Sequence, residues 1–289
     1  SGDWSSDVCS SDLKGCICLD IDGTTTAEAD RIPKRVIRCL EKLHQEGWQF
    51  LFATGRIFSY ASKALSEIPF PYFFAVQNGA DLLHMPEKEV VEKRYLSGGV
   101  ISEIDALQKE FKEDFVVYLG PEKGDACYYR PSRFSSTFQE HNERIQALSA
   151  APWLIKQDFK GVEGESFPLV KRLGRKEEME ALQKKLQSIE GIEVSCIKDP
   201  LHSEIYLNLI TAAGVNKGSV LKKLREELPK GAKFIAAGDD YNDVAMLQEA
   251  DVAIVMQSAP KKMHALADII AKPATEEGII KALLKATEE

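Results

Sequence analysis

Short apolar runs alternate with amphipathic segments along the first part of the chain. Cys16–Leu19 is apolar throughout and predicts a buried strand. A helix is predicted to begin at Pro33 and to end before Gly47, because the apolar positions between them recur at helical spacing: Val36, Ile37, Leu40 and Leu43. Two further apolar runs, Trp48–Ala53 and Phe73–Val76, flank a second predicted helix that extends to Ser66.

The same alternation returns late in the chain. A helix is predicted around Val220, Leu221 and Leu224. It is followed by a strand at Phe234–Ala237, a helix at Asn242–Glu249, a strand at Val252–Val255 and part of a last helix at Gly278–Leu284. Fully apolar strands that alternate with helices predict a parallel sheet covered on both faces. The predicted fold class is therefore α/β, with a Rossmann-like doubly wound parallel sheet as its core.

A segment of different texture separates these two blocks. It contains two predicted strands around a turn, a charged amphipathic helix and two more strands: Phe115–Leu119, Ala126–Tyr129, Lys176–Ile189, Ile192–Ile197 and Glu204–Leu209. We expect residues 14–83 and 211–289 to form the core and residues 84–210 to form an inserted α+β domain. Residues 1–13, which repeat Ser-Ser-Asp without periodicity, are interpreted as a cloning remnant or a disordered tail.

Composition and charge narrow the function classes. The chain has 289 residues, of which 44% are hydrophobic and 28% charged, as in an ordinary globular protein. A net charge of -8 argues against nucleic acid or an acidic membrane as a partner, and no apolar run is long enough to span a membrane. The cysteines are few, and no secretory segment precedes them, so reduced thiols in a cytoplasmic protein are expected; Cys16 and Cys18 are interpreted as buried strand thiols.

Polar side chains follow the predicted strands of the core. Asp20, Thr54, Asn78 and Asp239 each come within two residues after the end of an apolar run. The carboxyl ends of parallel strands share one edge of a sheet, so we expect these side chains to converge there. The same edge would gather five carboxylates, which would repel one another unless a cation lay among them: Asp20, Asp22, Asp239, Asp240 and Asp243. Oxygen ligands without His or Cys favour Mg²⁺ over Zn²⁺. Lys217 could hold an anion at this edge, although taken alone it could be a surface lysine.

Four ordered motifs support a family resemblance. Asp-Ile-Asp-Gly-Thr at 20–24, Ala-Thr-Gly-Arg at 53–56, Asn-Lys-Gly at 216–218 and Gly-Asp-Asp-Tyr-Asn-Asp at 238–243 resemble the four motifs of the haloacid dehalogenase-like superfamily. Asn78-Gly79-Ala80 and the size of the insert resemble the Cof-type phosphatase branch, subfamily IIB. The resemblance extends from Gly15 to the C-terminus.

The resemblance implies a role for each motif residue. Asp20 would be the nucleophile that forms an aspartyl-phosphate, and Asp22 would be the general acid and base. Phosphate would be bound by Thr54, Gly55 and Lys217, and Mg²⁺ by Asp20, the backbone carbonyl of Asp22, and Asp239, with Asp243 and Asp240 supporting the metal ligands. Three residues are either substrate contacts or structural hydrogen bonders: Arg56, Asn78 and Asn242.

Two positions depart from the family pattern. Asp240 stands where Asn is common, and Thr25 where an apolar residue is common. Neither departure removes a catalytic group. The insert would be a cap that closes over the site; its aromatic residues and its cations Lys171, Arg172 and Arg175 are interpreted as packing or solvated side chains.

The predicted function is hydrolysis of a small phosphorylated metabolite, such as a hexose phosphate, by a bacterial cytoplasmic Mg²⁺-dependent phosphatase. No nucleic acid, membrane or obligate protein partner is expected. Three alternatives remain: a phosphosugar mutase of the same superfamily, a non-hydrolytic phosphoacceptor module, and a catalytically silent binding protein. A phosphoacceptor module requires only one domain and lacks a cap.

Overall fold

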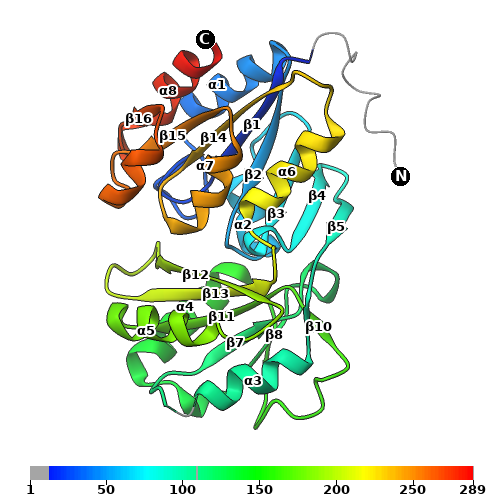
Figure 1. Cartoon of the computed structure of the whole chain (residues 1–289), viewed down its shortest axis with the longest axis vertical. Coiled ribbons are helices and arrows are strands. Elements are labelled where there is room, and N and C mark those ends of the chain that lie inside the picture. The colour runs from blue at the N-terminus through cyan, green and yellow to red at the C-terminus, as the bar shows by residue number, and fades with distance from the viewer. Residues whose placement is uncertain (1–12, 109, 289) are drawn as a thin grey trace.

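Residues 13–108 and 110–288 are described by a computed structural model that forms two lobes, each built on one large sheet (Figure 1). The predicted tail, residues 1–13, lies outside the described residues except for Leu13. The upper lobe in Figure 1 holds both chain ends of the described part, and the lower lobe is formed by the middle of the chain.

The upper lobe is the predicted α/β core. Its eight-stranded sheet has the order β16-β15-β14-β1-β2-β3-β4-β5, and β16 through β3 run parallel. The parallel strands are β1 (Gly15–Asp20), β2 (Trp48–Ala53), β3 (Tyr72–Val76), β14 (Lys233–Gly238), β15 (Val252–Met256) and β16 (Ile269–Ala271). This arrangement confirms the predicted fold class.

Alternate residues of these strands are buried on opposite faces of the sheet. Ile17 and Leu19 of β1 pack into one apolar cluster, and Cys16 and Cys18 pack into the other. Helices cover both faces because each face is apolar: α1 (Lys34–Gln45), α2 (Phe58–Ala64) and α8 (Gly278–Glu288) on the first, α6 (Lys217–Glu227) and α7 (Val244–Glu249) on the second. The described cysteines are free, and Cys16 and Cys18 are buried strand thiols as predicted.

The sheet of the core extends further than predicted. Strands β4 (Asp81–Met85) and β5 (Glu89–Lys93) continue it in antiparallel orientation, so it is not parallel throughout. The expected boundary at residue 83 falls inside β4. The expected return to the core at residue 211 falls inside β13 (Tyr206–Ala212), which belongs to the other sheet. We propose domain boundaries near residues 94 and 213.

The lower lobe is built on a six-stranded sheet of order β12-β13-β11-β7-β8-β9. Its other strands are β7 (Phe115–Tyr118), β8 (Cys127–Tyr129), β9 (Trp153–Ile155), β11 (Leu169–Gly174) and β12 (Ile192–Lys198), and β6 (Leu96–Ser97) pairs separately with β10 (Ser166–Phe167). Its helices are α3 (Gly99–Gln108), α4 (Ser136–Ser149) and α5 (Lys176–Leu186). We refer to this lobe as the cap.

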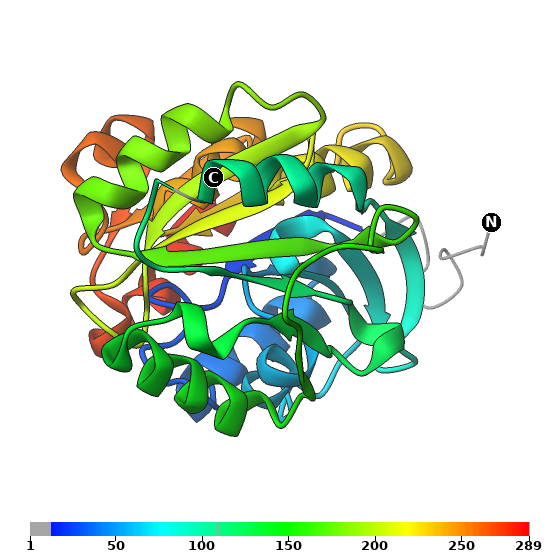
Figure 2. The same ribbon diagram turned by 90° about the horizontal axis from the view of Figure 1, so that it is seen from below.

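The two faces of the cap sheet have different neighbours. One face packs against α3 and α5, whose Ile104, Met179 and Leu182 join Phe115 in an apolar cluster. The other face packs toward the core, where Ile57 and Tyr60 share a cluster with residues of the cap strands. Figure 2, which looks from below, shows the cap in front of the core.

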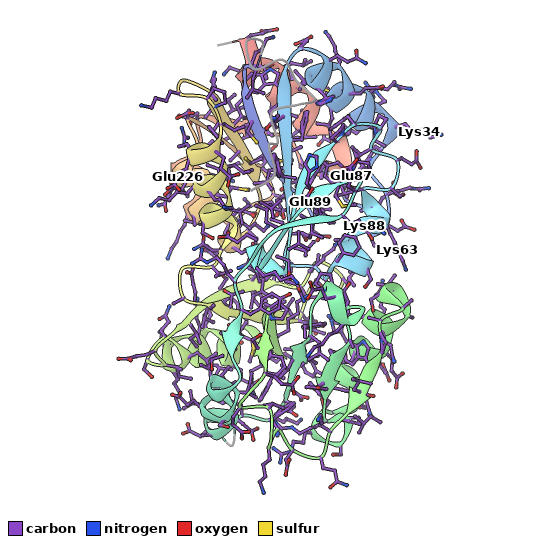
Figure 3. The ribbon with its side chains drawn as sticks, turned by 90° about the vertical axis from the view of Figure 1, so that its right-hand side faces the viewer. Lys34, Lys63, Glu87, Lys88, Glu89 and Glu226 are labelled. Carbon is purple, nitrogen blue, oxygen red and sulfur yellow. The ribbon has the colours of Figure 1, made fainter. Side chains whose placement is uncertain are left out.

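Charged side chains lie mainly on the outside of both lobes. Lys34, Glu87 and Glu226 are exposed and point away from the core (Figure 3). Among residues 13–108 and 110–288, none of the helices combines the length and the apolar character that crossing a membrane requires.

One buried carboxyl group predicts a pH dependence of stability. Asp81 is buried at the start of β4; its Oδ1 accepts a hydrogen bond from Tyr95 Oη at 2.6 Å, while Oδ2 has no partner in the described structure. Burial raises the pKa of Asp81 from 3.8 to about 7, against the opposing effect of the Tyr95 hydrogen bond. The folded state therefore binds the proton more tightly, and stability present below about pH 4 is lost as the pH rises through about 7.

Asp81→Asn should remove this pH dependence, because the amide stays neutral. We expect the variant to exceed the wild type in free energy of unfolding by about 1–3 kcal/mol above pH 7, and to lose that advantage near pH 4. Urea unfolding at both pH values measures the difference. Equal differences at the two pH values would contradict the assignment.

Candidate active site

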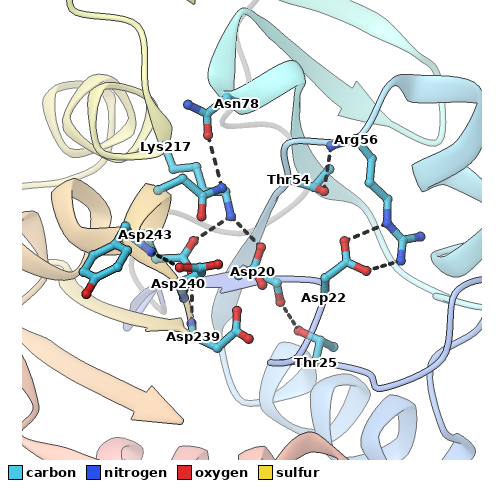
Figure 4. Close-up of polar contacts among 12 residues, drawn as sticks. Asp20, Asp22, Thr25, Thr54, Arg56, Asn78, Lys217, Asp239, Asp240 and Asp243 are labelled. Carbon is cyan, nitrogen blue, oxygen red and sulfur yellow. Dashed lines mark hydrogen bonds and ion pairs between the residues drawn. The ribbon is translucent and has the colours of Figure 1, made fainter. Parts of the chain in front are cut away.

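Four polar residues meet at the carboxyl edge of the core sheet. Asp20 ends β1, Thr54 follows β2, Asn78 lies in the short 3₁₀ helix after β3, and Asp239 follows β14. These strands are adjacent, in the order β14-β1-β2-β3, so the predicted convergence is confirmed. Figure 4 shows the side chains gathered at this edge.

Lys217 joins two carboxylates that are far apart in the sequence. It is the first residue of α6, and its Nζ donates to Asp20 Oδ1 and to Asp243 Oδ1, each at 2.5 Å (Figure 4). All three side chains are buried, so the interaction is poorly screened by solvent. Burial acts to lower the pKa of Lys217, but the two aspartates outweigh it and raise that pKa above its usual value. Lys217 is therefore a buried cation rather than the surface lysine of the alternative interpretation.

Asp243 uses its second oxygen to hold the loop after β14. Its Oδ2 accepts the backbone N–H groups of Asp239 at 2.9 Å and of Asp240 at 3.0 Å. Both oxygens of Asp243 are thus engaged within the protein. Asp20 differs, because only its Oδ1 is held and Oδ2 accepts no hydrogen bond from the described residues. One oxygen of Asp20 is therefore free to react.

The acidic residues form a group that fits a divalent cation. Carboxylate oxygens of Asp20, Asp239 and Asp243 lie within 4.8 Å of one another. Burial, then repulsion from Asp243, raises the pKa of Asp20 to about 8; burial and repulsion from Asp20 raise that of Asp239 well above its usual value. A cation among these oxygens would relieve both effects, and a site of oxygen ligands suits Mg²⁺.

Arg56 holds the carboxylate of Asp22. Its Nε donates to Asp22 Oδ2 at 2.7 Å and Nη2 donates to Oδ1, while Nη1 donates to the carbonyl oxygen of Ala29 at 2.5 Å. The guanidinium also lies 4.2 Å from the ring centroid of Tyr60. Burial acts to lower the pKa of Arg56, but pairing with Asp22 raises it overall. Arg56 therefore holds the Asp22 carboxylate in position.

Gly55 lines the cavity between the lobes, and the buried Thr54 precedes it. Thr54 Oγ accepts the backbone N–H of Arg56 at 3.1 Å, which leaves its hydroxyl proton free to donate to a ligand. A Cβ added to Gly55 would lie 3.0 Å from Leu209 Cδ1 of the cap, so a glycine allows the lobes to approach closely here.

Asn78 and Asn242 contact each other rather than standing apart. Asn242 Nδ2 donates to Asn78 Oδ1 at 3.4 Å, and both residues are buried. Asn78 adopts a left-handed conformation with φ of 61°, and its Nδ2 has no partner among the described atoms. Asn78 Nδ2 is therefore a buried donor available at the edge of the site.

Asp240 connects the core to the cap. Its Oδ1 accepts the N–H of Tyr241 at 2.7 Å, and its Oδ2 accepts the N–H of Lys198, at the end of β12, at 3.0 Å. An asparagine side chain has one oxygen, so its other terminal atom, the amide nitrogen, could not accept the second backbone N–H. The departure from the family pattern thus has a physical reason, because a carboxylate can accept both backbone groups. Burial raises the pKa of Asp240.

A cavity of about 1350 Å³ separates the edge of the core from the cap. Asp20, Asp22 and Asp239 line its core side, and Tyr118, Lys171, Asp199 and His202 line its cap side. The sequence interpretation assigned none of these cap residues to the site. The available signal was weak: Lys171 stands at an alternating position of the apolar run Leu169–Leu173.

Gly23→Ala tests the position of Asp239. Gly23 has φ of +72°, and a Cβ there would lie 2.1 Å from Asp239 Oδ2. We expect the displaced carboxylate to weaken the binding of a divalent cation at this acidic group about 10- to 100-fold, measured by calorimetric titration with Mg²⁺. Gly191→Ala is the control, because Gly191 has a similar φ of +80° but no neighbour within 4 Å. An equal effect of both substitutions would show that backbone strain alone is responsible.

Comparison with known proteins identifies related sequences. The sequence profile of the haloacid dehalogenase-like hydrolases matches residues 17–283. A 5-amino-6-(5-phospho-D-ribitylamino)uracil phosphatase of Bacillus subtilis is 23% identical over 270 residues, which cover 92% of this chain and 93% of that protein. A phosphoglycolate phosphatase of Methanobrevibacter smithii is 24% identical over 277 residues, covering 93% of this chain and 97% of that protein.

Solved structures share the fold at low sequence identity. A sugar phosphatase of haloacid dehalogenase subclass IIB superposes with a TM-score of 0.74 at 20% identity, covering 94% of this chain and 99% of that one. A haloacid dehalogenase-like hydrolase from Bacteroides thetaiotaomicron gives a TM-score of 0.71 at 21% identity, with 94% and 99% covered. The predicted family resemblance is confirmed.

Proposed function

The chain belongs to the haloacid dehalogenase-like hydrolases and is a phosphoric monoester hydrolase, and on this premise we propose that it hydrolyses a small phosphorylated metabolite with Mg²⁺ through an aspartyl-phosphate on Asp20. The observation that carries the proposal is that only one of the two carboxylate oxygens of Asp20 is held by the protein. Lys217 holds one of its carboxylate oxygens at 2.5 Å, while the other is free beside a cavity large enough for a small metabolite.

In the first step, Asp20 Oδ2 attacks phosphorus as the bond from phosphorus to the leaving oxygen breaks. Asp22 gives its proton to that oxygen, and Arg56 stabilises the carboxylate that results. In the second step, Asp22 takes a proton from water as the water oxygen attacks phosphorus and the bond to Asp20 breaks. Inorganic phosphate leaves and Asp20 is regenerated.

Other residues stabilise charge on the transferring phosphoryl group. Lys217 neutralises Asp20 before attack and phosphoryl oxygens afterwards. The Thr54 hydroxyl donates to a phosphoryl oxygen. Asp20, Asp239 and the backbone carbonyl of Asp22 would hold Mg²⁺, which when bound supplies Lewis-acid stabilisation. Asp243 supports the site, because both of its oxygens are already engaged.

The names of the relatives and the size of the cavity support the proposed substrate class. The curated relatives are named as phosphatases of a ribitylaminouracil phosphate and of phosphoglycolate, and a structural relative is named as a sugar phosphatase. These support a small phosphorylated metabolite. The cytoplasmic location and the absence of nucleic-acid or obligate protein partners stay predictions.

A panel of phosphorylated metabolites, assayed for phosphate release with EDTA and after Mg²⁺ is restored, tests the proposal. We expect turnover of at least one ester, loss with EDTA and recovery with Mg²⁺. Release without metal would overturn the Mg²⁺ requirement. Product analysis separates the phosphosugar mutase alternative, since a mutase returns an isomeric sugar phosphate and little free phosphate.

A further inference from the structure

A lysine stands among apolar side chains on the face of the cap sheet that looks toward the core. Leu169, Lys171 and Leu173 alternate along β11, and both leucines belong to the apolar cluster on this face. Lys171 pairs across the sheet with Leu209 of β13 and Val116 of β7, which belong to the same cluster. Lys171 is therefore a cation surrounded by apolar side chains, and it lines the cavity.

No carboxylate of the described residues lies within 4.0 Å of the Lys171 ammonium. The ammonium instead lies over the ring of Tyr118, with Nζ 5.4 Å from the ring centroid. Asp199 is close enough to act on Lys171 but is engaged elsewhere: its Oδ1 accepts the N–H of Leu201 at 2.7 Å, and its Oδ2 lies 3.3 Å from His141 Nε2. Burial lowers the pKa of Lys171 to about 8, and Asp199 and Asp22 act in the opposite direction.

Lys171 lies near the residue that is proposed to give a proton to the leaving group. Its charge interacts with those of Asp22 and Arg56, the proposed proton donor and the residue that positions it. Two more cations, Arg144 and Lys198, line the same cavity, are exposed, and have no carboxylate within 4.0 Å in the described structure. The cap thus offers unpaired positive charge in a protein whose net charge is -8.

We propose that Lys171 is a specificity-determining residue that binds a second anionic group, a carboxylate or a phosphate, in the leaving group of the substrate. The inference rests on the proposed phosphatase function. A neutral hydroxyl would leave the charge of the half-buried Lys171 ammonium uncompensated, whereas an anion forms a charge-assisted hydrogen bond with it. Arg144 and Lys198 attract the same anion toward the cavity.

Matched pairs of esters that differ only in the second anion test the inference. Phosphoglycolate against hydroxyethyl phosphate tests a carboxylate, and a hexose bisphosphate against the hexose monophosphate tests a phosphate. We expect the wild type to favour the anionic member of at least one pair. Lys171→Met should reduce the ratio of the two kcat/KM values about 10- to 100-fold, mainly through KM. Lys171→Arg should restore the preference.

Lys156→Met is the matched control. Lys156 is a partly buried cap lysine whose Nζ lies 4.3 Å from the ring centroid of Tyr128, but it does not line the cavity. For the Lys156→Met variant, the ratio of the two kcat/KM values should equal that of the wild type. A purely structural role for Lys171 would lower kcat/KM for both members of a pair alike, which would overturn the inference.

Calorimetric binding of the intact esters to Asp20→Asn protein separates the two proposals. If both the wild type and Lys171→Met release phosphate with the same ratio of kcat/KM values for the two esters, the anion subsite is contradicted while the phosphatase function is supported. No phosphate release from any ester by the wild type overturns the phosphatase. The subsite then stands if binding still favours the anionic ester in a Lys171-dependent way, and falls if it does not.

Discussion

Asp20→Asn should abolish phosphate release, by at least about a thousandfold, while the chain stays folded. The amide keeps the shape of the side chain but is not a nucleophile. The fold should tolerate the change because Lys217 keeps Asp243 as a partner at 2.5 Å. The substitution also removes one carboxylate from a cluster in which burial and Asp243 raise the pKa of Asp20 to about 8. We therefore expect a melting temperature in metal-free buffer equal to or above that of the wild type.

Phosphate release and thermal unfolding measure the two effects. Asp30→Asn is the control, because Asp30 is an exposed carboxylate in the loop after the first motif and should be neutral in both assays. Undiminished turnover by Asp20→Asn would remove the covalent mechanism. Trapped phosphoenzyme on acid quench of the wild type, absent from the variant, would support it directly.

Lys217→Met should both inactivate and destabilise the protein. The substitution leaves the buried carboxylates of Asp20 and Asp243 without their shared cation, and losing one partner of a buried pair costs about 3–5 kcal/mol. Catalysis should fall at least about a hundredfold, since the charge opposite the phosphoryl group is gone. Urea unfolding and phosphate release measure both effects.

Lys223→Met is the control on the same helix. Lys223 pairs with Glu227 at 2.9 Å near the surface, and such pairs contribute about 0.3–0.5 kcal/mol. The double variant Lys217→Met with Asp20→Asn should recover part of the lost stability, because one unpaired carboxylate is removed. A single variant as stable as the wild type, or a double variant less stable than Lys217→Met alone, would contradict the role of Lys217 as the shared cation.

Local pattern was sufficient to predict most elements of the core, although the edge strand β16 was not predicted. Its strands are apolar on both faces because helices cover both, so β1 and β2 were readable as short apolar runs. Strand β5 and the end of β4 were assigned to the insert, because the exposed, charged residues of β5, such as Glu89, do not resemble a buried strand. In the cap, β9 and β11 were not predicted at all; β11 carries Lys171 and Arg172 within its apolar run.

The sequence by itself determined which residues reach the carboxyl edge of the sheet, because strand ends and helix starts are set by local pattern. Only the tertiary structure decided how they pair. Asp20 and Lys217 are separated by 197 positions and meet only because α6 packs on the sheet beside β1. Likewise, Asp240 reaches Lys198, and Lys171 faces the cavity, through the docking of the cap on the core. Such contacts depend on long-range packing geometry, which periodicity along the chain does not encode.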